Sequence, residues 1–218
     1  EVMAFVYRAL DALGHEEADP DTLWGLVLDA GAASVRTLAL LDAANTEALG
    51  HPVPTPVTFG HRPGKAILVS GHDLHDLKAL LEQTAGRDIA IYTHGEMLPA
   101  HGYPELNKHP HLAGHIGGAW MKQRQEFATF PGAILMTSNC IQEPRKGYRD
   151  RLFTCGPVGW PGVTHIAPSK LGIRTGEFVV MIAGLMALNA LSVDVMLPGL
   201  PAIGAALDVA ADNDRQLV

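Results

Sequence analysis

The chain has 218 residues, of which 47% are hydrophobic and only 18% are charged, and its formal net charge is -7. This length is enough for one sizeable hydrophobic core or two small ones. The acidic balance and the scattered Lys and Arg residues leave no basic face, which excludes a nucleic-acid-binding protein.

Cysteine use and the two ends of the sequence give further expectations. Cys140 and Cys155 are too few for a disulfide framework, and no signal-peptide pattern opens the sequence, so we expect a reduced, cytoplasmic protein. The sequence opens at Glu1, without Met, inside one helical pattern and stops at Val218 inside another. We therefore expect both ends to be cut from something longer.

Two helices are predicted in the first fifty residues. Apolar residues within 2–13 recur at spacings of three and four, which is the buried face of an amphipathic helix. Asp19 and Pro20 provide an N-cap and a first-turn proline for a second helix, whose apolar spacing runs through 23–41. We expect a helical hairpin, followed by a proline-rich linker at 51–56.

Short apolar runs alternate with helical patterns in the next hundred residues. The runs are 66–69, 89–92, 133–136 and, as a fourth candidate, 152–154, and helical spacing occupies 74–83 and 120–130. Alternation of this kind indicates βαβ units and a parallel sheet that is covered on both faces. The predicted fold class is therefore α/β, with a Rossmann-like parallel sheet after the N-terminal helical hairpin.

Metal-competent side chains follow the first three apolar runs. His72, Glu96 and Cys140 come shortly after the first, second and third runs, respectively. Because ligands of such sheets bind outside the carboxyl ends of the strands, we expect these side chains to meet at one edge. Imidazole, carboxylate and thiolate together suit an iron site. We predict that His72, Glu96 and Cys140 bind metal.

Each of these residues also has a simpler interpretation on its own. His72 follows a glycine at a turn, and Asp73 could instead be the N-cap of the next helix. Glu96 at a helix start would be favoured by the helix dipole without any metal, and a single cysteine such as Cys140 is more often packed than ligating. The common position of all three at strand ends favours the metal site.

Four segments resemble the hybrid cluster proteins, also called prismane proteins or hydroxylamine reductases. They are GHDLHDL at 71–77, YTHGEMLPAHGYP at 92–104, FPGAILMTSNCIQ at 130–142 and VGWPGV at 158–163. The resemblance runs collinearly from residue 1 to about 166. It implies that His72, Glu96 and Cys140 are ligands of the hybrid iron-sulfur-oxygen cluster, of the 4Fe-2S-2O type, and that Glu96 is also catalytic.

The same resemblance implies an activity. Hybrid cluster proteins are expected to reduce hydroxylamine to ammonia, or nitric oxide to nitrous oxide, with electrons from a redox partner protein. Related carbon monoxide dehydrogenases are expected to have a cysteine where Glu96 stands, so a domain of that kind is the alternative. The cysteines of the family's separate iron-sulfur cubane and its further cluster ligands are absent here, so we expect this chain alone to be an inactive fragment.

The remaining cysteine and histidines receive structural roles. Cys155 matches no ligand position and is predicted to be a buried structural thiol. His94 and His101 are interpreted as groups that surround the metal ligands and hold them in place without binding the metal themselves. His109, His111 and His115 share no paired ligand spacing and are interpreted as surface residues.

The C-terminal part has a different composition. Residues 178–193 carry no charge, and the apolar character continues to residue 207, which is long enough to cross a bilayer. The stretch from about 174 to 218 resembles the first transmembrane helix of a major-facilitator drug efflux transporter, with Asp194 as an intramembrane acid. A buried helix of a soluble domain is the alternative.

These patterns predict three parts: a helical segment at 1–56, a partial Rossmann-like cluster-binding domain at 57–166, and a linker with an apolar helix at 167–218. Two hypotheses for function follow. The chain is either a fragment of a hybrid cluster oxidoreductase or a chimera, whose only functional element is a membrane helix.

Overall fold

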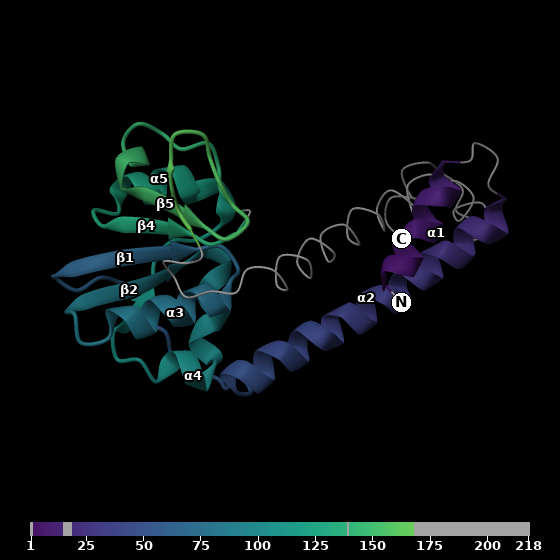
Figure 1. The fold of residues 1–218 in the computed structure, drawn as a ribbon. Helices are drawn as coiled ribbons and strands as arrows, with labels where there is room; N and C mark the ends of the chain where they lie inside the picture. The colour runs from purple at the N-terminus through teal and green to yellow at the C-terminus, as the bar shows by residue number, and fades with distance from the viewer. Residues whose placement is uncertain (1, 15–18, 139, 168–218) are drawn as a thin grey trace, which may run out of the picture. The chain divides into compact units, whose positions relative to one another are not determined.

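The computed structural model describes residues 2–14, 19–138 and 140–167 (Figure 1). The chain divides into two compact units, one that includes the residues up to Ala44 and one that starts at Asn45. The apolar stretch at 178–193 and Asp194, with the predicted transmembrane helix, lie outside the described residues.

A helical hairpin forms the first unit, as predicted. Its helices are α1 (Val2–Leu13) and α2 (Pro20–Leu49), of which α2 continues into the second unit. Asp19 caps α2, because its carboxylate accepts hydrogen bonds from the backbone N–H groups of Asp21 and Thr22 at 3.0 and 3.1 Å. Small and large apolar residues interdigitate between the two helices, namely Phe5, Ala9, Leu26, Ala30 and Ala33.

Helix α2 ends at Leu49 and is followed by Gly50, whose φ of 81° is the left-handed conformation that glycine adopts readily. By length and composition alone α2 could cross a membrane, with a mean hydropathy of 1.3 over its most apolar window, and it is the single such helix in the described residues. Core helices of globular proteins meet the same criterion, so this property does not assign α2 to a bilayer.

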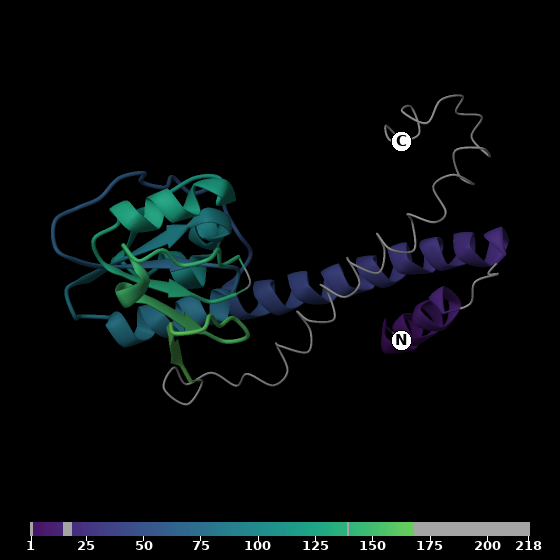
Figure 2. The same ribbon diagram turned by 90° about the horizontal axis from the view of Figure 1, so that it is seen from above.

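One parallel sheet organises the second unit (Figures 1 and 2). Its strands are β1 (Lys65–Ser70), β2 (Ile89–His94), β3 (Leu112–His115), β4 (Ala133–Met136), β5 (Leu152–Cys155) and β6 (Thr164–Ile166). They lie in the order β3-β2-β1-β4-β5-β6, and each neighbouring pair is parallel. The predicted α/β fold with a Rossmann-like sheet is confirmed.

Alternate residues of the central strands enter two separate cores. On β1, Val69 packs on the face that α3 (Leu74–Thr84) covers, and Leu68 packs on the opposite face with Phe127 of α5 (Gln123–Thr129). On β2, Ile91 and Tyr92 divide in the same way. This period of two explains why each strand reads as a continuous apolar run.

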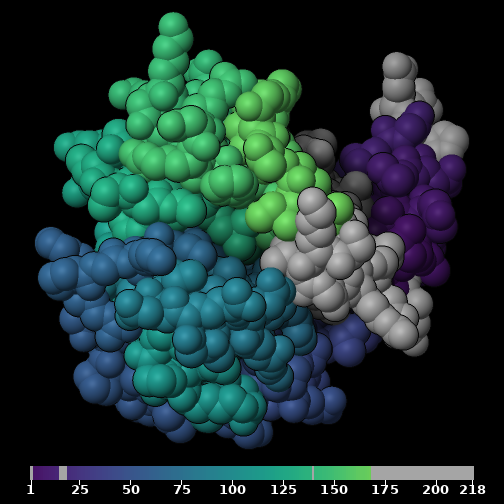
Figure 3. Space-filling view, turned by 60° about the vertical axis from the view of Figure 1, so that its left-hand side comes forward, coloured from purple at the N-terminus to yellow at the C-terminus, as the bar shows by residue number. Residues whose placement is uncertain are grey.

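Short helices complete the second unit, whose described residues run from blue through teal to green in Figure 3. They are η1 (Gly95–Gly102), α4 (Pro104–Asn107), η2 (Trp120–Lys122) and η3 (Arg149–Arg151). The predicted helix at 120–130 is thus divided between η2 and α5.

Two strands were not predicted, β3 and β6. Strand β3 has the sequence LAGH, whose glycine and histidine interrupt the apolar run by which the other strands were predicted. Strand β6 is only three residues long. Both lie at the outer positions of the sheet, where only one neighbouring strand constrains the sequence. Their identity depends on pairing with a neighbour, which local pattern does not reveal.

A buried acid lies between the start of α3 and the end of β5. Asp73 is the N-cap of α3, so the alternative interpretation of this residue is confirmed. Asp76, in the first turn, is 1% exposed and accepts a hydrogen bond from the thiol of Cys155 at 3.3 Å. Cys155 is fully buried, as predicted. Burial, followed by the charge of Asp73, raises the pKa of Asp76 to about 7.

This raised pKa predicts a pH-dependent stability. The folded state holds the proton of Asp76 more tightly than the unfolded chain does. The contribution of this proton to the free energy of unfolding is therefore complete below about pH 4 and is lost as the pH rises to about 7. Each unit of pKa difference is worth roughly 1.4 kcal/mol. Urea unfolding from pH 4 to 8 should therefore show a smaller decline for Asp76→Asn than for the natural chain. The exposed Asp150 provides the control Asp150→Asn, and equal slopes for all three proteins would contradict the assignment.

Candidate metal centre

The sheet reverses its strand order between β1 and β4. From β1 the chain moves outward through β2 and β3 on one side, and then returns to form β4, β5 and β6 on the other. Such a switch point leaves a crevice at the carboxyl ends of the two central strands, where α/β proteins bind their ligands. His72 follows β1, Cys140 follows β4 and Glu96 follows β2.

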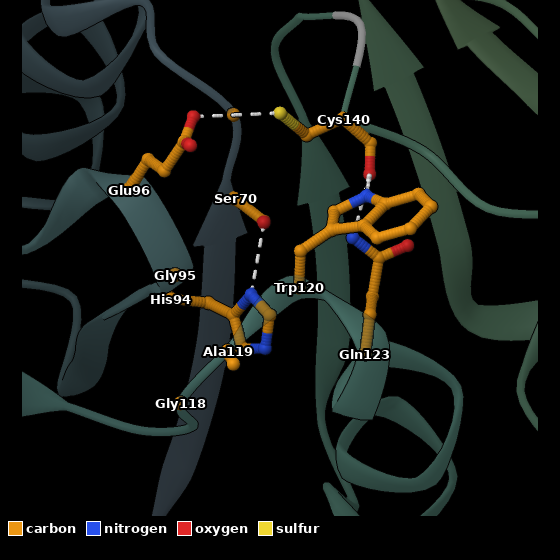
Figure 4. A pocket seen from close by; sticks show the side chains of 10 residues that line it. Ser70, His94, Gly95, Glu96, Gly118, Ala119, Trp120, Gln123 and Cys140 are labelled. Carbon is orange, nitrogen blue, oxygen red and sulfur yellow. Dashed lines mark hydrogen bonds between the residues drawn. The ribbon is translucent and has the colours of Figure 1, made fainter. Parts of the chain in front are cut away.

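The structure brings the three predicted ligands together. One donor atom from each of His72, Glu96 and Cys140 lies within 4.8 Å of the other two. His72 Nε2 and Glu96 Oε2 are in hydrogen-bond contact, and Cys140 Sγ lies 3.4 Å from His72 Nε2 and 3.6 Å from Glu96 Oε2. Figure 4 shows the carboxylate and the thiol facing each other. The predicted convergence is therefore present.

His72 is oriented by a serine that the sequence analysis did not single out. Ser138 Oγ accepts the backbone N–H of His72 at 2.8 Å and lies 2.6 Å from His72 Nδ1. Ser138 is 2% exposed, so water does not compete for these bonds. A metal at Nε2 requires the proton to be on Nδ1, from which it can be donated to Ser138. The arrangement supports the ligand role of His72.

The loop that carries Cys140 is held through its backbone. The Cys140 carbonyl accepts hydrogen bonds from Trp120 Nε1 at 3.0 Å and Gln123 Nε2 at 2.7 Å (Figure 4). Burial, together with the negative charge of Glu96, raises the pKa of the Cys140 thiol to about 11. The metal-free residue is therefore a thiol, and a metal ion would displace its proton.

Glu96 has the opposite electrostatic environment. It lies in the first turn of η1 and is the most exposed of the three, and the hydrogen bond from His72 holds the pKa of its carboxyl group below the usual range. The three donors therefore supply one neutral nitrogen, one anionic oxygen and one sulfur. This mixed set suits iron. It does not suit Mg²⁺ or Ca²⁺, which prefer ligand sets made of oxygen alone.

A glycine permits the close approach of β1 and the loop after β4. Gly71 has a φ of 118°, and a Cβ at this position would lie 2.5 Å from Thr137 Oγ1 and 2.7 Å from the backbone nitrogen of Ser138. Neither conformation nor space therefore allows a larger residue. Gly71 sets the separation between His72 and Ser138.

A pocket opens beside the three ligands (Figure 4). Its lining comes from the ends of β1 and β2 and the residues after them, from 118–123, and from the loop after β4. It consists of Ser70, Gly71, His94, Gly95, Glu96, Gly118, Ala119, Trp120, Gln123 and Cys140. No sequence pattern pointed to Trp120 or Gln123, because they act through a backbone carbonyl that is distant in sequence. Glu96 and Cys140 therefore border a space that a small substrate could enter.

The other histidines differ from expectation in one respect. His94 and His101 are buried near the carboxyl edge, where His94 lines the pocket and His101 bonds to Thr93 at 2.8 Å. The prediction that His115 is a surface residue was wrong, since it is 3% exposed and its Nδ1 lies 2.9 Å from Thr93 Oγ1. His115 ends the unpredicted strand β3, and Phe59 packs against its ring. His109 and His111 are half-buried.

Comparison with known proteins identifies the family. A sequence profile described as the Prismane/CO dehydrogenase family matches residues 1–187. The chain belongs to this family. Members of the prismane family are iron-sulfur cluster proteins, which agrees with the predicted chemistry of the site. The match extends beyond residue 166 into the apolar stretch that was predicted to be transporter-like, and the comparisons give no support for a transporter helix.

Named relatives of the chain are hydroxylamine reductases. The protein from Rhodospirillum rubrum is 64% identical over 166 residues, which are 76% of this chain and 30% of the relative. The protein from Thermodesulfovibrio yellowstonii is 61% identical over 166 residues, with 31% of the relative covered. For Solidesulfovibrio magneticus the identity is 55% over 193 residues, 88% of this chain and 35% of the relative. The chain thus spans about a third of the length of these family members.

The close packing at Gly71 predicts a stability and site defect. Gly71→Ala forces a side chain into the left-handed region and against the loop after β4, which should cost about 1–3 kcal/mol. We expect a lower urea midpoint and a displaced His72 resonance in NMR spectra. Gly147→Ala is the matched control, because a Cβ there meets nothing within 4 Å. Similar midpoints for the two variants would contradict the packing.

Proposed function

We propose that this chain provides part of the ligand set of a hybrid iron-sulfur-oxygen cluster of the 4Fe-2S-2O type. In this proposal the complete protein is a cytoplasmic hydroxylamine reductase. The observation that carries the proposal is the convergence of His72, Glu96 and Cys140 within 4.8 Å at the switch point of the sheet. The names of the relatives support the same chemistry.

Each ligand has a role that follows from its chemistry. His72 would bind iron as a neutral imidazole and Cys140 as a thiolate, while Glu96 would bind on the side that faces the pocket. The cluster, when bound, would supply the electrons for reduction. A carboxylate can change between one and two metal contacts, so Glu96 could make room for substrate while it stays anchored. Glu96 is therefore the proposed catalytic residue among the three.

The proposed reaction is the two-electron reduction of hydroxylamine. The N–O bond breaks as NH2OH, two electrons and two protons give NH3 and H2O, and the electrons come from a redox partner protein. Reduction of nitric oxide to nitrous oxide is the other proposed activity. A carbon monoxide dehydrogenase site is less well supported, because such enzymes are expected to have a thiolate where this chain has the Glu96 carboxylate.

A charge-removing substitution tests the role of Glu96. The completed protein, meaning this chain joined to the remaining length that its relatives have, should lose most hydroxylamine reduction on Glu96→Gln and retain its fold. The loss should exceed the roughly 10–100-fold that removal of an outer hydrogen bond to a metal ligand costs. Glu105→Gln is the control, since Glu105 pairs with Lys108 outside the pocket. Undiminished turnover by Glu96→Gln would refute the proposed role.

The 218-residue chain alone should not hold the cluster. Three ligands supply too little anionic charge and too few bridging thiolates for a multi-iron species. Anaerobic reconstitution with iron and sulfide, followed by visible absorption and iron analysis, should find no stoichiometric cluster. A stable multi-iron species would overturn this expectation and would direct attention to Cys155, His94 and His101 as replacement ligands.

A further inference from the structure

Beside the three predicted ligands, Ser70, His94 and Glu126 form a row of hydrogen-bonded side chains. His94 Nδ1 lies 3.0 Å from Ser70 Oγ, and His94 Nε2 lies 2.9 Å from Glu126 Oε2. Ser70 is 2% exposed and His94 is 1% exposed, and both line the pocket beside Glu96 and Cys140. Figure 4 shows the Ser70 hydroxyl directed toward a nitrogen of the His94 ring.

The directions of these hydrogen bonds follow from the acceptor at one end. Glu126 uses both carboxylate oxygens as acceptors, Oε1 for the backbone N–H of Gly118 at 3.0 Å and Oε2 for His94. His94 must therefore carry a proton on Nε2. A neutral imidazole that donates from Nε2 has an unprotonated Nδ1, which can only accept. The single hydroxyl proton of Ser70 is then donated to Nδ1, and Ser70 Oγ can only accept a further bond.

Packing prevents the imidazole from leaving this arrangement. A Cβ at Gly117, whose φ is 101°, would lie 2.5 Å from His94 Cδ2 and 2.9 Å from Glu126 Oε2. On another side the ring of Phe127 lies 4.9 Å from the His94 ring, centroid to centroid. The three polar side chains are thus fixed relative to one another.

The other polar side chains of the lining already take part in hydrogen bonds. Trp120 Nε1 and Gln123 Nε2 donate to the Cys140 carbonyl, and Gln123 Oε1 accepts the backbone N–H of Gln142. Glu96 contributes a carboxylate, which accepts. Among the described lining side chains, Ser70 Oγ and the Glu96 carboxylate are therefore the acceptors beside the pocket.

We propose that Ser70 accepts a hydrogen bond from the substrate, that Glu126 is the positioning residue that fixes this polarity, and that the pocket therefore favours ligands with N–H or O–H groups. Hydroxylamine has such groups, whereas nitric oxide has no hydrogen to donate. This inference rests on the proposed function and selects hydroxylamine over nitric oxide at the same site.

One substitution should reverse the polarity with almost no change of shape. In Glu126→Gln the backbone N–H of Gly118 would hold the amide oxygen, so the amide NH2 would face His94 Nε2. His94 would then carry its proton on Nδ1 and donate to Ser70 Oγ, and the Ser70 hydroxyl would point its hydrogen into the pocket. Ser70→Ala removes the acceptor without changing the Glu126 contact.

Nitrogen-15 NMR of the histidine-labelled 218-residue chain tests the predicted tautomer of His94. The natural chain should show the Nε2–H tautomer at His94, and Glu126→Gln should show the Nδ1–H tautomer. The exposed-pair variant Glu105→Gln should leave the His94 signals unchanged. An Nδ1–H tautomer in the natural chain, or the same tautomer in both proteins, would overturn the assigned polarity.

Ligand affinity tests the proposed hydrogen bond from the substrate to Ser70. The measurement uses the completed protein with its cluster bound. Calorimetric titration with hydroxylamine should give an affinity about tenfold weaker for Ser70→Ala and for Glu126→Gln, since one lost or reversed hydrogen bond weakens binding by about that factor. Nitric oxide affinity should change much less. Equal changes for both ligands, no change for either, or no hydroxylamine binding by the natural protein would each overturn the inference. Ser70-dependent binding without turnover would instead contradict the proposed function and leave the inference standing.

Discussion

Parallel pairing of β1 with both β2 and β4 is the constraint on which the site depends. Ser70 at the end of β1 is in register with His94 on one side and with Met136 on the other. Because all three strands point the same way, the chain must turn away from the sheet at the same edge three times. Residues that follow these turns, including His72 and Glu96, therefore meet at this edge.

Hydroxyl groups determine how the histidines at this edge are oriented. Ser138 fixes His72, Ser70 contacts His94, and Thr93 lies between His101 Nε2 and His115 Nδ1 at 2.8 and 2.9 Å. Since Thr93 has one proton, it can donate to only one of its two rings and must accept from the other. Such networks remove the rotational freedom of buried rings and hold a preorganised site in place before a metal or substrate arrives.

The sequence predicted the strand ends better than the network between them. The apolar runs located β1, β2, β4 and β5, and the positions just after them located His72, Glu96 and Cys140. An apolar run and the residues that follow it can be recognised from neighbouring positions in the sequence. The position of His115 and the roles of Ser138 and Glu126 could not be predicted. They depend on partners far away in sequence, such as Thr93 for His115 and His94 for Glu126, and on glycines that permit close approach only in the folded chain.

The central claim is that His72, Glu96 and Cys140 bind the same metal centre. Anomalous diffraction at the iron absorption edge, from crystals of the completed and iron-loaded protein, tests this most directly. The predicted result is iron within bonding distance of His72 Nε2, a Glu96 carboxylate oxygen and Cys140 Sγ at the carboxyl edge between β1 and β4. Iron bound elsewhere, with these three side chains contacting only one another, would contradict the claim.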